Sequence, residues 1–200
     1  MKVLGILGSP RRGGNTETLL KAFLEGAMAG GAEVEEIRLR ELKISPCMEI
    51  YHCFKDGTCP IKDDMPALYD KLLAADVVVL ASPIFFYNVS AQAKAMIDRT
   101  QALWARRYIL KKDFPPGRQG VLLAVGATKG RLLFVGTRLT AKYFFDALDV
   151  SYAAEILVRG ADEKGAISEQ PEVLEKALDL GRRLSQGEKL GPIKLDPLAV

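Results

Sequence analysis

The residues with the clearest chemical potential lie in a polar stretch between Gly8 and Thr16, which reads GSPRRGGNT. It follows a short apolar run without helical period and precedes apolar positions at helical spacing, so it predicts a strand, a tight loop and a helix start. A helix N-terminus offers unpaired backbone N–H groups and the positive end of the helix dipole, which together suit an anion. Donors from Ser9, Asn15 and Thr16 suit a phosphate monoester with three free oxygens.

Other phosphate-binding loops match these residues less well. After Gly8 and Gly13 a Walker-type loop would need Lys and then Ser or Thr, but the chain continues with glycine and Asn15. A dinucleotide fingerprint places bare glycine backbone against a pyrophosphate, whereas Pro10 and two arginines fill much of this loop. The loop also lacks the cysteine nucleophile that a phosphatase of similar shape would need. An ordinary turn, in which Asn15 or Thr16 only caps the helix, stays an alternative.

Two further loops carry residues suited to a flat ligand. A buried strand at 76–82 ends in Pro83 and is followed by the aromatic loop IFFYNV at 84–89. A third buried strand at 120–125 runs into the small residues GAT at 126–128, whose backbone a ligand could approach closely. The alternatives are aromatic side chains tucked into the core and a simple glycine turn.

Strands and helices alternate along the chain. A charged strand at 33–39 suits a sheet edge, a last strand is expected at 151–158, and one helix is expected after Ser90, including Ala93 through Trp104. The alternation predicts an α/β fold with a parallel sheet, helices on both faces and right-handed crossovers. Five strands fit the flavodoxin-like order 2-1-3-4-5 of a three-layer sandwich. In that order the loops after the first, third and fourth strands meet, so the three unusual loops are expected to form one site.

Length and composition suit one domain, because 200 residues with 48% apolar side chains can bury a substantial core. We expect this domain at 1–187 and an extended tail at 188–200, which contains Pro192 and Pro197. No apolar run approaches the ~20 residues of a membrane span and no signal-peptide pattern precedes the first strand, which predicts a cytoplasmic protein without a membrane partner. The net charge is only +3, and the basic stretch at 106–118 fits a solvated connection, so no nucleic-acid partner is expected.

Two motifs together resemble the NADPH-dependent FMN reductase family, and the likeness extends over most of the chain. They are GSPRRGGNTETLL at 8–20 and SPIFFYNVSAQAKAMIDR at 82–99, with supporting spacing through Gly160, Asp162, Gly165 and Pro171. Within the family the closest likeness is to the iron–sulfur flavoprotein branch. The resemblance implies bound FMN, hydride transfer from NAD(P)H to the flavin, and electron transfer onward to a small-molecule or protein acceptor. It also implies a homodimer or homotetramer in which a neighbouring subunit helps to cover the flavin.

The resemblance further assigns cofactor-binding residues. Those around the FMN phosphate would be Ser9, Arg11, Asn15 and Thr16. Those around the isoalloxazine ring would be Pro83, Ile84, Phe85, Phe86 and Tyr87, with Gly126, Ala127 and Thr128 on its other side. No residue is assigned as catalytic, since the flavin carries the chemistry, and Asp98 and Arg99 are expected to be a surface pair or a subunit contact. Two other functions stay open: an FMN electron carrier without its own NAD(P)H activity, and a flavin-dependent interaction or sensor module.

The loop between Lys43 and Lys62 departs from the iron–sulfur flavoprotein pattern, in which four cysteines occur with two residues between each of the first three. Here the four positions are occupied by Cys47, Ile50, Cys53 and Cys59. Because a [4Fe–4S] cluster takes four thiolates, a cluster would need a further ligand such as water or His52. Zinc held by the three cysteines and His52 is another option, but the adjacent His52 and Cys53 would have to bend round one ion. We therefore expect no metal, and reduced thiols in a loop that shapes the flavin pocket or the subunit contact.

Overall fold

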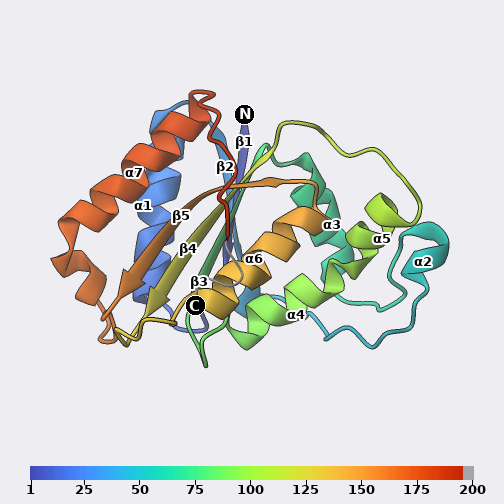
Figure 1. Ribbon diagram of the computed structural model, residues 1–200, viewed down its shortest axis with the longest axis horizontal. Helices are drawn as coiled ribbons and strands as arrows, with labels where there is room; N and C mark the ends of the chain where they lie inside the picture. The colour runs from blue at the N-terminus through green and yellow to red at the C-terminus, as the bar shows by residue number, and fades with distance from the viewer. Residues whose placement is uncertain (196–200) are drawn as a thin grey trace.

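The computed structural model describes residues 1–195, which form a three-layer α/β sandwich around one sheet (Figure 1). The strands are β1 (Lys2–Leu7), β2 (Glu33–Arg38), β3 (Val77–Pro83), β4 (Gln119–Gly126) and β5 (Ser151–Arg159). All neighbouring strands pair in parallel, and their order is β2-β1-β3-β4-β5. The predicted order and the edge position of the charged second strand are therefore confirmed.

Helices cover both faces of the sheet (Figure 1). They are α1 (Asn15–Ala29), α2 (Cys53–Asp56), α3 (Met65–Ala74), α4 (Ala91–Arg99), α5 (Gln101–Tyr108), α6 (Val135–Ala147) and α7 (Pro171–Ser185), with short 3₁₀ turns at Leu39–Glu41 and Ala166–Glu169. The expectation of a single helix after Ser90 is wrong. The helix breaks at Thr100, whose hydroxyl donates to the Ile97 carbonyl at 2.6 Å.

Each face of the sheet has its own hydrophobic cluster. Helices α1 and α7 pack on one face, and α3, α4, α5 and α6 pack on the other. Helices α1 and α7 touch through glycine, since a Cβ at Gly26 would overlap the Leu178 carbonyl and a Cβ at Gly181 would overlap the Phe23 carbonyl. The two helices therefore meet backbone to backbone.

Two arginines expected at the surface are buried. Arg118 is only 3% exposed and donates to the carbonyls of Leu72, at 2.8 Å, and Leu148, so it satisfies backbone groups near the ends of α3 and α6. Its burial lowers its pKa. The interpretation of residues 106–118 as a solvated connection is therefore wrong at Arg118, whose side chain is buried and bonds backbone carbonyls.

Arg99 is 1% exposed and does not pair with Asp98. It pairs with Asp63 at 2.6 Å, while Asp98 pairs with Lys94 at 2.7 Å on the helix surface. The expected Asp98–Arg99 surface pair is therefore wrong. On a helix, adjacent residues point in different directions, and here one points into the protein and the other to solvent.

Residues 186–195 form neither helix nor strand and run back over the sheet. Ile193 N donates to Tyr152 O at 2.8 Å, and the Gln119 side chain bonds the backbone of Glu188 and Leu190. Of the expected tail, Pro197 lies outside the described residues. Within residues 1–195 no helix has the length and apolar character that a membrane crossing requires.

Candidate functional site

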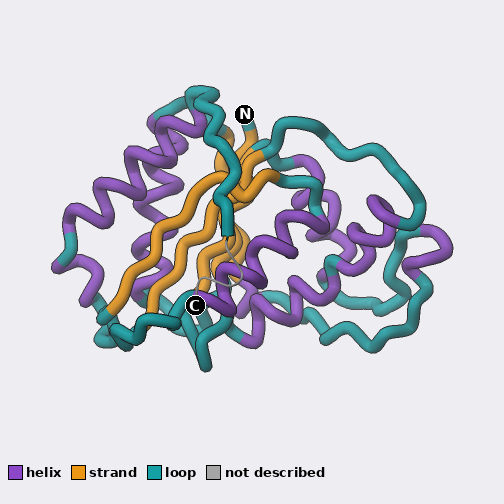
Figure 2. The backbone as a smooth tube through the Cα atoms, viewed as in Figure 1, coloured by secondary structure: helices purple, strands orange, loops and turns teal. Residues whose placement is uncertain are grey.

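The loops after β1, β3, β4 and β5 gather at the carboxyl edge of the sheet (Figure 2). Backbone hydrogen bonds join each loop to its neighbour. Gly8 N donates to Ala81 O at 2.7 Å, Ile84 N to Val125 O at 2.9 Å, and Ala161 N to Gly126 O at 3.2 Å. The three loops expected to converge therefore lie side by side, and the loop after β5 adjoins them.

The loop after β1 opens onto the N-terminus of α1, which has no side-chain cap. The first amide of this helix with a backbone partner is that of Thr18, which donates to Gly14 O at 3.1 Å. The preceding amides, from Asn15 to Glu17, therefore point out of the helix toward the loop. Ser9 and Thr16, which are each 3% exposed, add two hydroxyls, and that of Ser9 makes one long hydrogen bond of 3.4 Å to the Arg11 carbonyl. Amides and hydroxyls grouped in this way could donate hydrogen bonds to a bound anion.

Asn15 has a different role from these donors. Its Nδ2 donates to the carbonyls of Ala161, at 3.1 Å, and Glu163, at 2.8 Å. Its Oδ1 accepts from the amides of Gly165, at 3.0 Å, and Ile167, at 3.3 Å. Every hydrogen-bonding position of the side chain is used, so Asn15 fastens the loop after β5 to α1 and only its backbone N–H stays open to a ligand.

Glu17 and Arg40 set the charge beside the loop after β1. The Glu17 carboxylate accepts from Gly13 N at 2.9 Å and from Arg40 Nη1 at 3.2 Å. Burial by itself would raise the pKa of Glu17, but the Gly13 hydrogen bond and the nearby positive charges outweigh burial and lower it. Glu17 is therefore ionised, and Arg40 offsets its charge.

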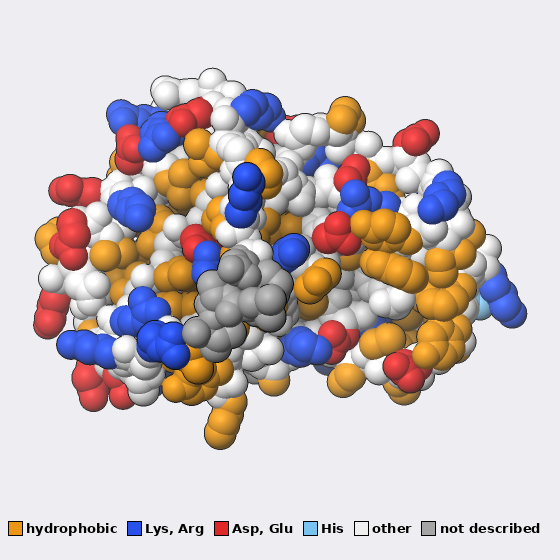
Figure 3. Space-filling view, viewed as in Figure 1, with side chains coloured by type: hydrophobic (Ala, Val, Ile, Leu, Met, Phe, Trp, Pro, Cys, Tyr) orange, Lys and Arg blue, Asp and Glu red, His pale blue; other side chains and the backbone are white. Residues whose placement is uncertain are grey.

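Basic side chains surround the same loop. Arg11 Nη1 donates to Asp162 O at 3.1 Å, and a Cβ at Gly13 would lie 3.4 Å from Lys164 Nζ. Figure 3 shows Lys and Arg side chains gathered beyond the ends of β4 and β5. Their positive potential favours a phosphate-bearing ligand at this edge of the sheet.

The loop after β3 presents its aromatic side chains to solvent. Two backbone hydrogen bonds between Phe85 and Asn88, at 2.9 and 3.0 Å, close a tight turn. Its central residues, Phe86 and Tyr87, both have positive φ, at 47° and 62°. Such a turn ordinarily uses Asn and Gly, and each bulky residue adds about 1–2 kcal/mol of strain. Phe86 is fully exposed and its two neighbours are half exposed, so the aromatic residues are not core residues.

The loop after β4 adjoins this aromatic turn. A Cβ at Gly126 would lie 3.5 Å from the Ile84 side chain, and one at Gly130 would lie 3.0 Å from Tyr87 Oη. Ala127 and Thr128 between them are exposed. The residues expected around a flavin ring therefore belong to two loops in contact, and the loop after β3 also adjoins the loop after β1.

Sequence reasoning missed the loop after β5 and the Glu17–Arg40 pair. The close spacing of Gly160 and Gly165 is a feature of the sequence that indicates a structured loop after β5. Both have positive φ, at 73° and 91°. The partner of Glu17 lies 23 residues away, beyond β2, and no local pattern connects the two.

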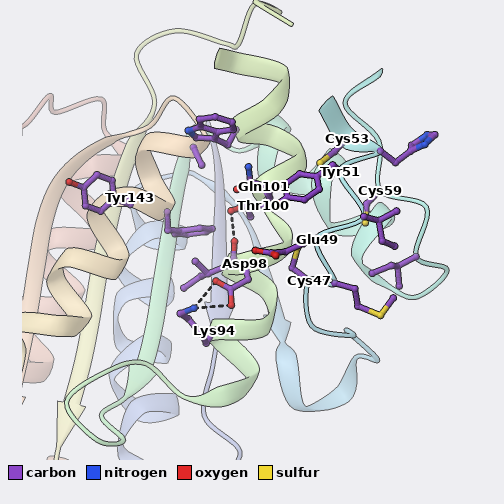
Figure 4. Close-up of a pocket in the computed structure, with 18 of the residues that line it drawn as sticks. Cys47, Glu49, Tyr51, Cys53, Cys59, Lys94, Asp98, Thr100, Gln101 and Tyr143 are labelled. Atoms are coloured by element: carbon purple, nitrogen blue, oxygen red, sulfur yellow. Dashed lines mark hydrogen bonds and ion pairs between the residues drawn. The ribbon is translucent and has the colours of Figure 1, made fainter. Parts of the chain in front are cut away.

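A separate cavity of about 850 Å³ lies between the cysteine loop, the α4–α5 helices and α6 (Figure 4). Cys47, Cys53 and Cys59 are free thiols that line it, and burial together with the nearby thiols raises the pKa of Cys53. His52 bonds Asp56 at 3.1 Å. Across residues 1–195, no three Cys, His, Asp or Glu side chains are arranged to hold a metal ion.

Comparison with known proteins matches most of the chain to one family. A model of the family described as NADPH-dependent FMN reductase matches residues 1–148. The iron–sulfur flavoprotein of Methanosarcina thermophila is 36% identical over 129 residues, which make up 64% of this chain and 65% of the relative. Another iron–sulfur flavoprotein, from Methanocaldococcus jannaschii, is 42% identical over 52% of this chain and 53% of its own. The chain thus spans between about half and two thirds of the length of these relatives.

Two further proteins match along nearly their whole length. A Bacillus subtilis protein whose name describes it as an NAD(P)H-dependent FMN-containing oxidoreductase on inference is 26% identical over 92% of this chain and 98% of the relative. The solved NAD(P)H:quinone oxidoreductase from Methanothermobacter marburgensis is 19% identical, with a TM-score of 0.71 over 94% of this chain and 98% of that one. The likeness to the solved structure shows the fold.

Proposed function

Since the chain belongs to the NADPH-dependent FMN reductase family, we propose that it binds FMN at the carboxyl edge of its sheet and acts as an oxidoreductase. In this proposal NAD(P)H is the hydride donor, and a small molecule or protein accepts the electrons. The observation that carries the proposal is the uncapped N-terminus of α1, with Ser9 and Thr16 buried beside it. Bound FMN would supply the hydride and electron transfer chemistry.

The residues of the first loop would hold the phosphate. The open amides at the start of α1 and the hydroxyls of Ser9 and Thr16 would donate to its oxygens, and Arg11 would add a positive charge. Asn15 would contribute its backbone amide, while its side chain keeps the loop after β5 in place. Arg40 neutralises the Glu17 carboxylate, which would otherwise repel the phosphate.

The residues of the other two loops would enclose the ring. Pro83, Ile84, Phe85, Phe86 and Tyr87 would lie along one side and exclude water from it. Gly126, Ala127 and Thr128 would close the other side, where the exposed backbone can come close to a flat ligand. No side chain of the site needs to act as an acid, a base or a nucleophile, because the chain's role is to bind, orient and shield.

A titration followed by anaerobic stopped-flow mixing tests the proposal. The purified chain should take up FMN at micromolar concentration. NADPH or NADH should then bleach the visible absorbance of the flavin, at a rate no slower than steady-state turnover with the same nucleotide. A quinone or another acceptor should restore the absorbance. A chain that fails to take up FMN contradicts the binding proposal, and a flavin that neither nucleotide bleaches contradicts the reductase proposal.

An electron carrier without NAD(P)H activity is the second candidate, and the relatives named iron–sulfur flavoproteins favour it. Bleaching by a reduced protein donor but not by NAD(P)H would support this candidate.

We also propose that the chain forms a homodimer or homotetramer, because the exposed aromatic turn at 85–87 leaves an apolar surface beside the flavin site. Light scattering on the FMN-loaded protein tests the assembly.

A further inference from the structure

The cysteine loop does not match the ligand requirement of the cluster that the names of the relatives imply. A [4Fe–4S] cluster is held by four thiolates. Three thiols line the cavity, and Ile50, which lines it as well, is half exposed and has no donor atom. His52 is bonded to Asp56 and precedes Cys53 directly, so it does not supply the fourth ligand.

The loop is closed by protein contacts alone. At its neck, Asp63 accepts from Arg99 Nη1 at 2.6 Å and from Arg99 Nη2 at 3.2 Å. The Ser45 amide donates to the same carboxylate at 2.9 Å, and the Ser45 carbonyl accepts from Arg99 at 2.9 Å. Both ends of the loop are thus fixed to one ion pair whose side chains are 0% and 5% exposed. A metal is not needed to hold this loop together.

The middle of the loop is also held from outside. Arg106 Nε on α5 donates to Gly57 O at 2.7 Å, and Lys112 Nζ donates to Asp56 O at 3.1 Å. Figure 4 shows Cys47, Cys53 and Cys59 grouped at the side of the cavity that this loop forms. Arg106 and Lys112 thus hold the backbone between Cys53 and Cys59 from outside the loop.

The backbone on both sides of Ile50 has the left-handed conformation, although no glycine is present there. Glu49 and Tyr51, on either side of it, have positive φ values of 50° and 57°. This conformation is strained for bulky residues, so it persists only where the surrounding structure holds it. Ile50, between these two residues, lines the cavity together with the three thiols.

We propose that this loop is a cluster site with one ligand missing. The chain as it stands holds no iron–sulfur cluster, and residue 50 alone decides this, so Ile50→Cys converts the loop into a [4Fe–4S] site. Among residues 1–195 no three such side chains are arranged to hold a single ion, which is compatible with this proposal. The irons of a cubane lie apart from one another, so its thiolates need not meet at one point.

In the Ile50→Cys variant, added ferric ion, sulfide and dithiothreitol supply all the atoms and electrons that cluster assembly requires. Four ferric ions and four sulfide ions supply the core, and each of the four thiols loses a proton to become a thiolate ligand. Two of the ferric ions are reduced by one dithiothreitol, which is oxidised to its cyclic disulfide and releases two protons. The product is a [4Fe–4S]²⁺ core with four bound thiolates.

The test is anaerobic reconstitution of the full chain with ferric ion, sulfide and dithiothreitol, followed by desalting and measurement of iron and sulfide per chain. Wild type should retain almost no iron, and Ile50→Cys should retain roughly four irons and four sulfides. Ile50→Ala should behave as wild type, and the double variant Ile50→Cys/Cys59→Ala should lose the iron again. Electron paramagnetic resonance after dithionite reduction should detect a cluster in Ile50→Cys alone.

Two outcomes would overturn the proposal. One is wild type retaining about three or four irons per chain, since three thiolates would then suffice for a cluster. The other is Ile50→Cys retaining no iron while its circular dichroism and unfolding midpoint equal those of wild type. If Ile50→Cys does not fold, Ile50→His supplies an imidazole ligand at the same place and is judged by the same iron measurement. Neither readout depends on FMN or on activity.

Discussion

At the scale of single residues, Asn15 couples two loops that lie far apart in the sequence. Its side chain reaches over about 150 residues of sequence to bond four backbone groups of the loop after β5. The sequence predicts Asn15 beside the FMN phosphate, and this stays a prediction that its backbone N–H can meet. Its side chain has a positioning role, because its donors and acceptors are already paired.

Asn15→Ala should therefore weaken both the fold and the flavin site. Four buried backbone groups lose their partner, and we expect the free energy of unfolding in urea to fall by about 2–4 kcal/mol. FMN affinity, measured by flavin fluorescence, should fall at least about tenfold because the loop is released. Thr18→Ala is the matched control, since its hydroxyl makes one long bond of 3.4 Å on the same helix. An unchanged stability for Asn15→Ala would contradict the coupling.

The buried pair of Asp63 and Arg99 should make stability depend on pH. Burial alone would raise the pKa of Asp63, but the hydrogen bonds from Arg99, Ser45 and Met65 and the charge of Arg99 lower it. The ionised carboxylate thus stabilises the fold fully above the ordinary carboxyl pKa of about 3.9, and this contribution is lost as pH falls through the lowered pKa.

Asp63→Asn should lower the free energy of unfolding at neutral pH by about 3–5 kcal/mol, since it leaves Arg99 buried without a counter-charge. Between neutral and acid pH its stability should change less than that of wild type. Asp98→Asn breaks the exposed pair with Lys94 and should cost about 1 kcal/mol or less. If the free energy of unfolding changed with pH equally in wild type and Asp63→Asn, the Asp63–Arg99 pair would not be a source of the pH dependence.

At the scale of elements, the contact between α1 and α7 depends on two glycines. A methyl group at Gly26 or Gly181 would overlap a backbone carbonyl of the facing helix. A side chain could rotate away from such a contact, but a helix backbone cannot. We expect Gly181→Ala to reduce the free energy of unfolding by about 1–3 kcal/mol, although alanine is the better helix former. Gly191→Ala is the control, because no atom lies within 4 Å of its added Cβ. Equal unfolding midpoints for the two variants would contradict the close contact.

The aromatic turn after β3 is strained and exposes apolar side chains to solvent, and both features lower the stability of the fold. Replacing Phe86 and Tyr87 together by Asn and Gly, the residues that favour both positive φ values, should relieve the strain at both positions and raise the free energy of unfolding by about 2–4 kcal/mol. FMN affinity should fall in the same variant, because the side chains proposed to shield the ring are gone. A gain in stability with unchanged FMN affinity would leave the strain without a role in flavin binding.

At the scale of the whole molecule, the sequence predicted the sheet but not what closes the domain around it. Apolar runs at β1, β3 and β4 are buried on both faces, so their strands could be located within one or two residues. Arg99 and Arg118 could not be placed, because their partners lie tens of residues away and a charged side chain has no local pattern that indicates burial. The role of Asn15 was missed for the same reason.

The four bonds of Asn15 also suggest the order in which a cofactor would leave. They join the loops after β1 and β5 where the phosphate is proposed to bind, whereas a strained, solvent-exposed turn borders the proposed position of the ring. Dissociation should then begin with the ring swinging outward while the phosphate stays anchored, and riboflavin, which lacks the phosphate, should escape far faster than FMN.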